Sequence, residues 1–252
     1  MENKRLIKVE FMDKNFQPYE IHIVGLPAAE VELVSFTDLP AHTMAVVTDT
    51  YNGRLDTIPR NVNVQIQNLK DIANTKLQTP MEFIHMTWLI KDVTRAFTHQ
   101  LVRYRVGTSF CQESMRFYGK HKVYKVLATH KAGSYFGIAP YASAVTESIR
   151  RYVEMVDKGM PSEDARGILP TNILTSIFFD CSLRTLQGIM PQRLCCQAQQ
   201  GEWGPILMEM RKQIAKNMSP MIANLLKAPY ERGEPCGYRA SFDRECKWQD
   251  SN

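Results

Sequence analysis

The hydrophobic period changes along this chain, and the change restricts the folds that it can adopt. Residues 4–11 and 20–25 alternate apolar and polar side chains, which is typical of half-buried strands. Further along, the longer apolar segments follow the spacing of one face of a helix instead. Strands at the front and a helical majority behind them predict the α+β class.

The ends of the predicted helices carry residues that start or stop a helix. Pro80 suits a first helical turn, Gly159 follows a helical repeat, and Ser162 begins a segment with acidic residues in its first turn. Pro170 interrupts that last segment. The predicted helices are residues 62–75, 80–104, 141–158, 162–169, 172–189 and 203–226. Within 80–104 we expect an interruption near residues 91–94, where two β-branched residues follow a charged pair.

Four segments fall outside this helical pattern. Residues 33–37 and 43–51 are short apolar segments that periodicity alone assigns to neither strand nor helix. Residues 108–117 are polar and are predicted to form a loop, and the tail from Pro229 is predicted to be loop or extended chain.

The bulk properties fit one large domain. The chain has 252 residues, 44% of them hydrophobic, and we expect one domain over 1–228 and a tail over 229–252. We expect the first strands to be an extension of this domain. No apolar run approaches the ~20 residues that a membrane span needs, and the charged start lacks the pattern of a signal peptide. The six cysteines contain no C-x-x-C pair, so reduced thiols in the cytoplasm are the simplest interpretation.

The positive charge is small and dispersed. The net charge is +5, and arginines stand singly inside apolar segments, where a guanidinium is usually paired with an anion. This pattern favours small phosphorylated ligands over a nucleic acid, which needs a continuous basic face. The histidines lack zinc-site spacing, so no metal is expected, and His85 and His99 are expected in the core or in an interface. The arginines that stand inside apolar segments are Arg95, Arg103, Arg105, Arg116, Arg166, Arg184 and Arg193.

One segment concentrates the candidate chemistry. An apolar stretch ends in Arg103-Tyr104-Arg105 and leads into a polar segment that ends at Arg116. Three arginines close together can bind a phosphate or pyrophosphate through charge-assisted hydrogen bonds, and Tyr104 can stack on a ring. The alternative is that these arginines pair with surface carboxylates.

This segment resembles the signature of the flavin-dependent thymidylate synthases, which reads Arg-His-Arg, seven residues, Ser, any residue and Arg. Here Arg103-Tyr104-Arg105 is followed by eight residues and then by Ser114, Met115 and Arg116. Tyr104 therefore replaces the central His, and the loop is one residue longer.

A second block supports the resemblance. Residues 165–172, Ala-Arg-Gly-Ile-Leu-Pro-Thr-Asn, resemble the family's Ala-Arg-x-x-Leu-Pro-x-Asn, and Arg184 and Arg193 follow at the family's spacing. Both blocks in order identify residues 45–228 as similar to the family. Leu77 stands where the family has a flavin-contacting His.

The resemblance implies two sets of site residues. Arg193 would lie against the uracil edge as the catalytic cation, and either Gln112 or Glu113 would take an acidic nucleotide-contact position. The implied FAD-binding residues are Thr79, Arg103, Tyr104, Arg105, Ser182 and Arg184. The implied dUMP-binding residues are Gln100, Gln112, Glu113, Ser114, Arg116, Arg166 and Arg193.

The implied activity is that of a methyltransferase that converts dUMP to dTMP. Methylenetetrahydrofolate supplies the carbon, and NADPH reduces the FAD, which carries the hydride chemistry. Ser114 is a second catalytic candidate, as a nucleophile, but substrate binding is favoured because no base stands beside it in the sequence. The resemblance also implies a single catalytic domain, helices packed with an antiparallel sheet, and a homotetramer with shared active sites.

Three other interpretations remain open. The first is an enzyme of the same fold that acts on another base or adds another group, such as a pyrimidine nucleotide hydroxymethylase, since Tyr104, Leu77 and the longer loop depart from the family. The others are a nucleic-acid-binding module and a purely structural protein. Dispersed arginines argue against the former, and the set Arg116, Arg166, Arg184 and Arg193 argues against the latter.

Overall fold

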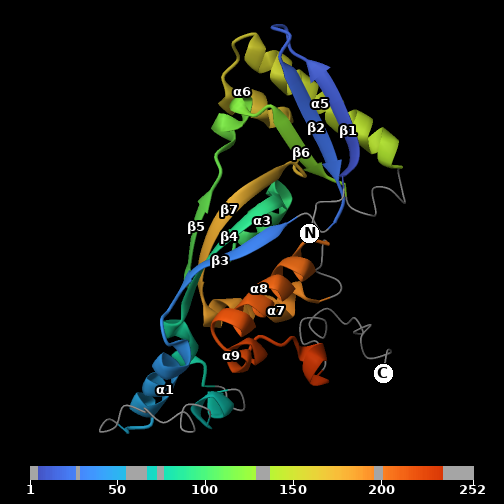
Figure 1. Ribbon diagram of the computed structural model, residues 1–252. Coiled ribbons are helices and arrows are strands. Elements are labelled where there is room, and N and C mark those ends of the chain that lie inside the picture. The colour runs from blue at the N-terminus through green and yellow to red at the C-terminus, as the bar shows by residue number, and fades with distance from the viewer. Residues whose placement is uncertain are drawn as a thin grey trace. The chain divides into compact units, whose positions relative to one another are not determined.

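A computed structural model describes residues 5–26, 29–54, 67–72, 77–128, 137–195 and 201–234 (Figure 1). The chain divides into two compact units. Unit 1 comprises Met1–Glu30, Ile90–Arg103 and Cys111–Ile177, and unit 2 comprises Val31–Leu89, Tyr104–Phe110 and Phe178–Asn252. Helices and strands are both present, so the predicted α+β class is confirmed.

Unit 1 contains a three-stranded sheet of order β1-β2-β6. The predicted N-terminal strands are confirmed as β1 (Arg5–Met12) and β2 (Pro18–Val24), which pair antiparallel. β6 (Val123–Leu127) pairs with β2 in parallel, so this sheet is mixed rather than wholly antiparallel, contrary to the expectation.

Helix α5 (Ile138–Asp157) covers one face of this sheet, as Figure 1 shows. The residues of β2, β6 and α5 that form the shared core alternate along the strands and repeat along the helix, as their apolar positions predict. They include Ile21, Ile23, Tyr124, Val126, Ile149 and Tyr152. The predicted helix 141–158 is thereby confirmed. The next predicted helix, from Ser162, is shorter than expected: α6 (Ser162–Ala165) passes directly into the 3-10 turn η3 (Arg166–Ile168).

The predicted helix 80–104 is wrong over its middle, and the interruption expected near 91–94 falls where a strand ends and a helix begins. The segment consists of the 3-10 turn η1 (Thr79–Phe83), strand β4 (His85–Thr94) and helix α3 (Arg95–Leu101). Thr94 produces the change from strand to helix, because its hydroxyl accepts a hydrogen bond from the Phe97 N–H at 2.9 Å and so caps α3.

The predicted helix 172–189 is wrong for the same reason. It begins as strand β7 (Leu174–Ser182) and continues as helix α7 (Leu183–Arg193). Ser182 is the cap here, and its hydroxyl accepts a hydrogen bond from the Thr185 N–H at 3.2 Å. In both segments a hydroxyl side chain caps the helix where the strand ends, and the apolar pattern alone does not reveal this change.

β4 and β7 are the central strands of a four-stranded sheet of order β3-β4-β7-β5. The ambiguous segment 33–37 belongs to strand β3 (Glu30–Phe36). The segment 108–117, expected as a loop, contains strand β5 (Thr108–Gln112) and the start of the 3-10 turn η2 (Met115–Lys120). The division between the two units falls within β4, β5 and β7.

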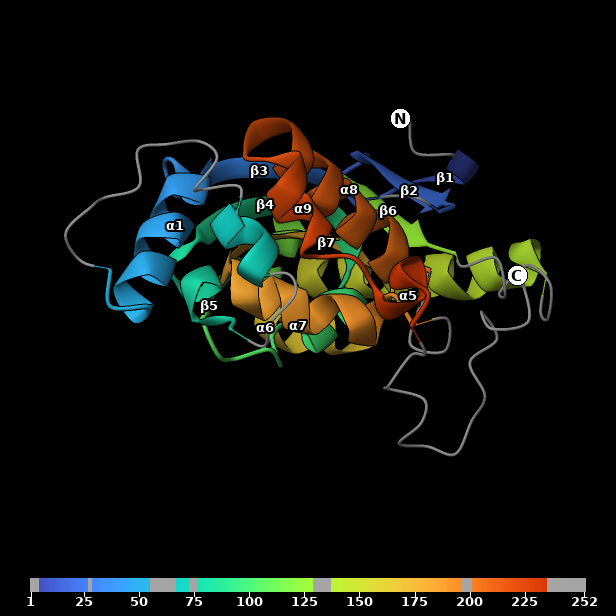
Figure 2. The ribbon, with the colours of Figure 1, turned by 90° about the horizontal axis from the view of Figure 1, so that it is seen from below.

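The remaining helices belong to unit 2, and Figure 2 shows them from below. The ambiguous segment 43–51 lies in α1 (Pro40–Tyr51). The predicted helix 203–226 is two helices, α8 (Trp203–Asn217) and α9 (Pro220–Asn224), because Ser219 caps α9 and Pro220 takes its first turn.

The described part of the tail is short and tied to α8. The 3-10 turn η4 (Pro229–Arg232) presents Glu231, whose carboxylate accepts two hydrogen bonds from Arg211 at 2.5 and 2.6 Å. Only 67–72 of the predicted helix 62–75 is described, and it is helical. Across the described ranges, no helix is long and apolar enough to cross a membrane.

Candidate active site

Arg116 and Arg166, the proposed phosphate ligands, lie together in unit 1. The Arg116 Nε lies 3.2 Å from the Glu163 carboxylate, and the Arg166 Nε donates to the Glu163 backbone carbonyl at 3.0 Å. Arg116 comes from η2, whereas Glu163 and Arg166 come from α6 and the turn after it. The two matched sequence blocks therefore meet at Glu163, which the sequence did not single out.

Glu113 and Gln112 have different environments. The Gln112 amide donates to Thr98 at 2.6 Å, so it is tied to α3. The Glu113 carboxylate accepts from Thr175 at 3.3 Å and lies 3.1 Å from His121. Glu113 lines a cavity of about 230 Å³ whose polar walls place opposite charges side by side, including the Lys125–Asp92 pair at 2.7 Å. Glu113 is therefore the acidic residue of the two, and its carboxylate lines a cavity.

The other unit 1 candidates lie on or near α3 and η2. Gln100 is on α3 and is half-buried. Arg103 is exposed, and one of its terminal nitrogens lies 3.3 Å from the His99 ring. The Ser114 hydroxyl accepts from the Arg116 N–H at 3.3 Å. This contact with a backbone amide gives Ser114 no base, which agrees with a binding role.

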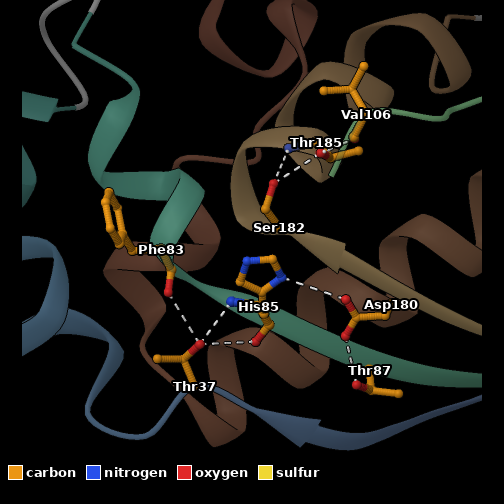
Figure 3. Close-up of polar contacts among 8 residues, drawn as sticks. All are labelled: Thr37, Phe83, His85, Thr87, Val106, Asp180, Ser182 and Thr185. Atoms are coloured by element: carbon orange, nitrogen blue, oxygen red, sulfur yellow. Dashed lines mark hydrogen bonds and ion pairs between the residues drawn. The ribbon is translucent and has the colours of Figure 1, made fainter. Parts of the chain in front are cut away.

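The turn that follows Tyr104 is fixed to the start of α7 in unit 2, as Figure 3 shows in part. The Thr185 hydroxyl donates to the Val106 carbonyl at 2.8 Å, and the Ser182 N–H donates to the Gly107 carbonyl at 3.1 Å. Gly107 has φ +63°, and a Cβ there would lie 2.8 Å from the Thr185 hydroxyl, so the turn requires glycine. The strand-helix junction therefore positions the proposed flavin segment through its backbone.

The proposed flavin residues of unit 2 differ in exposure. Ser182 is buried at 4% exposure and its hydroxyl caps α7. Thr79 and Arg105 are exposed. Arg184 lies 3.2 Å from Glu82 and lines an open groove together with two further cations, Lys227 and Arg232. The exposed guanidiniums of Arg105 and Arg184 fit a flavin nucleotide, whose phosphates need cations.

Arg193, the proposed catalytic cation, ends α7 and contacts two aromatic side chains. Its Nε donates to the Tyr104 hydroxyl at 2.8 Å. Its guanidinium lies 4.6 Å from the centre of the Trp203 ring and 5.5 Å from that of Tyr104. The structure thus brings together Tyr104, from the altered signature, and Arg193, which are far apart in the sequence.

A core position, one of the two environments expected for His85 and His99, is wrong, and the other, an interface, stays a prediction. Both are exposed rather than in the core. His85 begins β4, and Figure 3 shows its ring directed toward Asp180, 3.6 Å away, which also accepts from Thr87 at 2.8 Å. The alternation of β4 explains the error, because a strand turns every second side chain outward where the predicted helix kept it inside.

The environment of Cys181 disfavours its thiolate. Burial raises the pKa of the Cys181 thiol, with the Asp180 charge as a second cause, so its nucleophilic thiolate is suppressed. Within the described segments, no group of three or more His, Cys, Asp or Glu side chains is arranged to bind a metal ion.

The fold and these arginine sets define an α+β protein suited to phosphorylated ligands. Residues 32–219 match the family model described as thymidylate synthase complementing protein. The chain is 33% identical over 194 residues to a flavin-dependent thymidylate synthase of Geobacter sulfurreducens, covering 70% of this chain and 78% of that protein. It is 28% identical over 201 residues to a protein of the same name from Pyrococcus furiosus, covering 74% and 79%.

A solved structure shares the fold. It is a UMP/dUMP methylase, PolB, of Streptomyces cacaoi, determined with 5-bromo-dUMP. The TM-score is 0.65 at 17% identity, and the match covers 80% of this chain and 95% of that one. The chain belongs to the thymidylate synthase complementing family, the flavin-dependent thymidylate synthases.

Proposed function

We propose that this chain converts dUMP to dTMP, with FAD as its cofactor, methylenetetrahydrofolate as the carbon donor and NADPH as the reductant. Family membership supports a flavin-dependent methyltransferase. The observation that carries the substrate assignment is the meeting of Arg116 and Arg166 at Glu163. Two guanidiniums that share Glu163, with the Ser114 hydroxyl bonded to the Arg116 backbone N–H, suit a nucleotide monophosphate, because a dianionic phosphate accepts several charge-assisted hydrogen bonds.

In this proposal, unit 1 residues bind the nucleotide. Arg116 and Arg166 bind its phosphate, with Ser114 as a neutral donor. Glu113 contacts the nucleotide in preference to Gln112, whose amide is already bonded to Thr98. Gln100, on the same helix as Thr98, is a further proposed contact.

A second set of residues is proposed for the flavin and the uracil ring. Arg103, Arg105 and Arg184 supply positive charge for the FAD phosphates and ring, and Thr79 supplies a hydroxyl. Ser182 acts indirectly, because its hydroxyl caps the helix that carries Arg184. FAD, when bound and reduced, supplies the hydride that completes the methyl group.

Arg193 contributes to the chemical step in this proposal. The pyrimidine ring gains electron density as the carbon unit is added and reduced, and that charge collects on its oxygens. A guanidinium fixed beside them stabilises this state more than the ground state, which raises the rate rather than only the affinity. The nucleotide phosphate and the flavin are assigned to other residues. Substitution of Arg193 should therefore change the rate of the chemical step more than the affinity for either ligand.

The test is the mass of the nucleotide product. We expect purified protein to release FAD on denaturation and to form dTMP from dUMP, methylenetetrahydrofolate and NADPH. A hydroxymethyl product, or turnover of dCMP alone, would assign the chain to the related hydroxymethylases or methylases of other bases. A colourless protein that cannot be loaded with FAD would refute the proposal.

We further propose that residues 1–228 form one catalytic domain, that 229–252 is a tail, and that the protein is a cytoplasmic homotetramer with shared active sites. Family membership supports this arrangement. Light scattering of the FAD-loaded protein measures the assembly, and a monomer active at every concentration would contradict it.

A further inference from the structure

Arg193 has an aromatic environment that the family signature does not explain. We define the Arg193 cluster as Arg193, Tyr104 and Trp203. The Tyr104 and Trp203 rings meet edge to face, with centres 6.3 Å apart and planes at 78°, and the guanidinium lies near both rings. The three side chains come from separate segments: Tyr104 precedes β5, Arg193 ends α7, and Trp203 begins α8.

Each aromatic partner is itself anchored. The Tyr104 hydroxyl accepts from the Arg193 Nε at 2.8 Å and donates to the Gln192 side-chain carbonyl at 3.0 Å. The Tyr104 backbone carbonyl accepts from Thr108 at 2.6 Å. Trp203 is 1% exposed. These contacts fix a ring face and a hydroxyl, and both are needed to set the plane and the rotation of a guanidinium.

The contacts from Tyr104 and Trp203 are neutral. A carboxylate partner would orient a guanidinium but would also offset its charge, whereas a ring face and a phenol orient it without adding a negative charge. A cation that must stabilise charge on a substrate benefits from partners of this kind, because they fix its geometry and do not themselves offset its charge.

We propose that Tyr104 and Trp203 are positioning residues that fix Arg193 for the reaction on the pyrimidine. The inference rests on the proposed function, in which Arg193 acts on the uracil ring. It gives a role to the residue that departs most clearly from the family signature, since Tyr104 stands where the family has His. The hydroxyl of Tyr104 aligns the Nε side of the guanidinium, and the indole of Trp203 sets its plane.

The first test removes only the hydroxyl. In Tyr104→Phe the ring remains, and we expect the rate of single-turnover flavin oxidation with saturating dUMP and methylenetetrahydrofolate to fall about tenfold or more, as for loss of a hydrogen bond to a charged group. The FAD dissociation constant, measured by flavin fluorescence, should change less than about twofold, because the hydroxyl that is removed is bonded to Arg193 and Gln192. Tyr51→Phe is the matched control, since Tyr51 lies at the end of α1 and is 69% exposed.

The second test restores the family residue and adds a pH readout. In Tyr104→His, a neutral imidazole accepts the hydrogen bond from Arg193, so much of the rate should return at alkaline pH. Below about pH 6.5 the ring is protonated, can no longer accept, and repels the guanidinium. The single-turnover rate of Tyr104→His should therefore fall below that pH relative to wild type at the same pH, and Tyr104→Phe should not show this additional fall.

Trp203 is tested with Trp203→Phe, because a smaller aromatic ring keeps a face for stacking while a buried aliphatic residue risks unfolding. We expect a loss of rate smaller than that of Tyr104→Phe and an unchanged FAD dissociation constant. A thermal melt of each FAD-loaded variant compares folding.

The outcomes separate the inference from the function. If Arg193→Ala turns over at the wild-type rate, Arg193 is outside the active site and both fail. If Arg193→Ala is slow but Tyr104→Phe is as fast as wild type, or Tyr104→His lacks the added pH dependence, the positioning role is wrong. If Tyr104→Phe weakens FAD binding and keeps its rate at saturating FAD, Tyr104 contacts the flavin instead, which also overturns the inference.

Discussion

Arg116 in unit 1 and Arg193 in unit 2 are both arginines at proposed substrate contacts, but their partners differ in kind. The Arg116 side chain is 66% exposed and its partner Glu163 is 51% exposed. Arg193 is half-buried and contacts the faces of Tyr104 and Trp203. An exposed ion pair contributes only about 0–1 kcal/mol, so a phosphate can replace Glu163 at small cost. The contact of Arg193 with Trp203 offers no such exchange, because a buried ring is not displaced by an anion.

The difference matches two separate tasks. A residue that must bind and release a nucleotide can start from a weak pair that the ligand replaces. A residue that stabilises a short-lived charge must already be in place before that charge forms. The comparison therefore predicts that Arg116 variants change affinity, whereas Arg193 variants change the rate of the chemical step.

The largest expected effect is that of Arg193→Ala. Removing one fixed donor or cation from developing charge reduces turnover by about 100-fold or more. Arg193→Lys should recover little, because an ammonium lacks the planar geometry that stacks on Trp203 and bonds to Tyr104. Single-turnover oxidation of pre-reduced enzyme, with saturating dUMP and methylenetetrahydrofolate, measures the effect.

The reductive half of the reaction serves as the control for the Arg193 variants. Reduction of the flavin by NADPH should persist in both variants, and both should bind FAD and remain folded. A wild-type rate in Arg193→Lys would show that charge alone suffices and that the planar geometry is irrelevant. The contrast with Arg116 would then lose its physical basis.

The next effect is that of Arg116→Ala and Arg166→Ala on nucleotide affinity. Each removes a charge-assisted contact with phosphate, so the dUMP dissociation constant should rise about tenfold or more. Calorimetric titration of dUMP into FAD-loaded protein gives this constant. The FAD dissociation constant should stay near that of the wild type.

Equal losses of dUMP and FAD affinity would show that these arginines do not distinguish the two ligands. Loss of FAD affinity alone would assign them to the flavin. Either result would break the division between nucleotide-binding and flavin-binding residues on which the proposed function depends.

The sequence predicted the amphipathic and alternating elements well. Helix α5 and strands β1 and β2 have one buried face each, so their periods are unambiguous. β4 and β7 were missed because each runs directly into a helix without a loop. Along 80–101 the apolar positions 84, 88 and 97 fit a helical repeat, and the change is marked only by the β-branched residues near 91–94 and the capping hydroxyl of Thr94. A capping residue in the middle of an apolar segment is a weak sequence feature, but in both segments it marked the helix start better than the hydrophobic period did.

The sequence predicted which residues belong to the candidate site but not which side chains contact one another there. The resemblance supplied Arg116, Arg166 and Arg193, but Glu163 and Trp203 follow no motif, and only the fold places them beside these arginines. The choice between Gln112 and Glu113 likewise depended on which side chain is bonded to α3. Contacts between distant segments need coordinates, because neither spacing nor periodicity encodes them.

The smallest predicted effect is that of Glu163→Gln, and it examines the exchange proposed for Arg116. The substitution keeps the shape and removes the charge, while the backbone carbonyl that accepts from Arg166 remains. If phosphate must replace Glu163, dUMP should bind about two- to fivefold more tightly in the variant at low salt, as expected for losing a competing surface pair. The gain should shrink as salt screens the pair.

Glu147→Gln is the matched control for Glu163→Gln, since Glu147 forms an exposed pair with Arg151 at 2.8 Å on α5, and it should leave dUMP affinity unchanged. Weaker dUMP binding in Glu163→Gln would mean that Glu163 holds Arg116 in its binding position and is not displaced. Arg116 would then be a prepositioned cation like Arg193, with a carboxylate where Arg193 has aromatic rings, and the two regions would differ in the chemistry of the partner rather than in task.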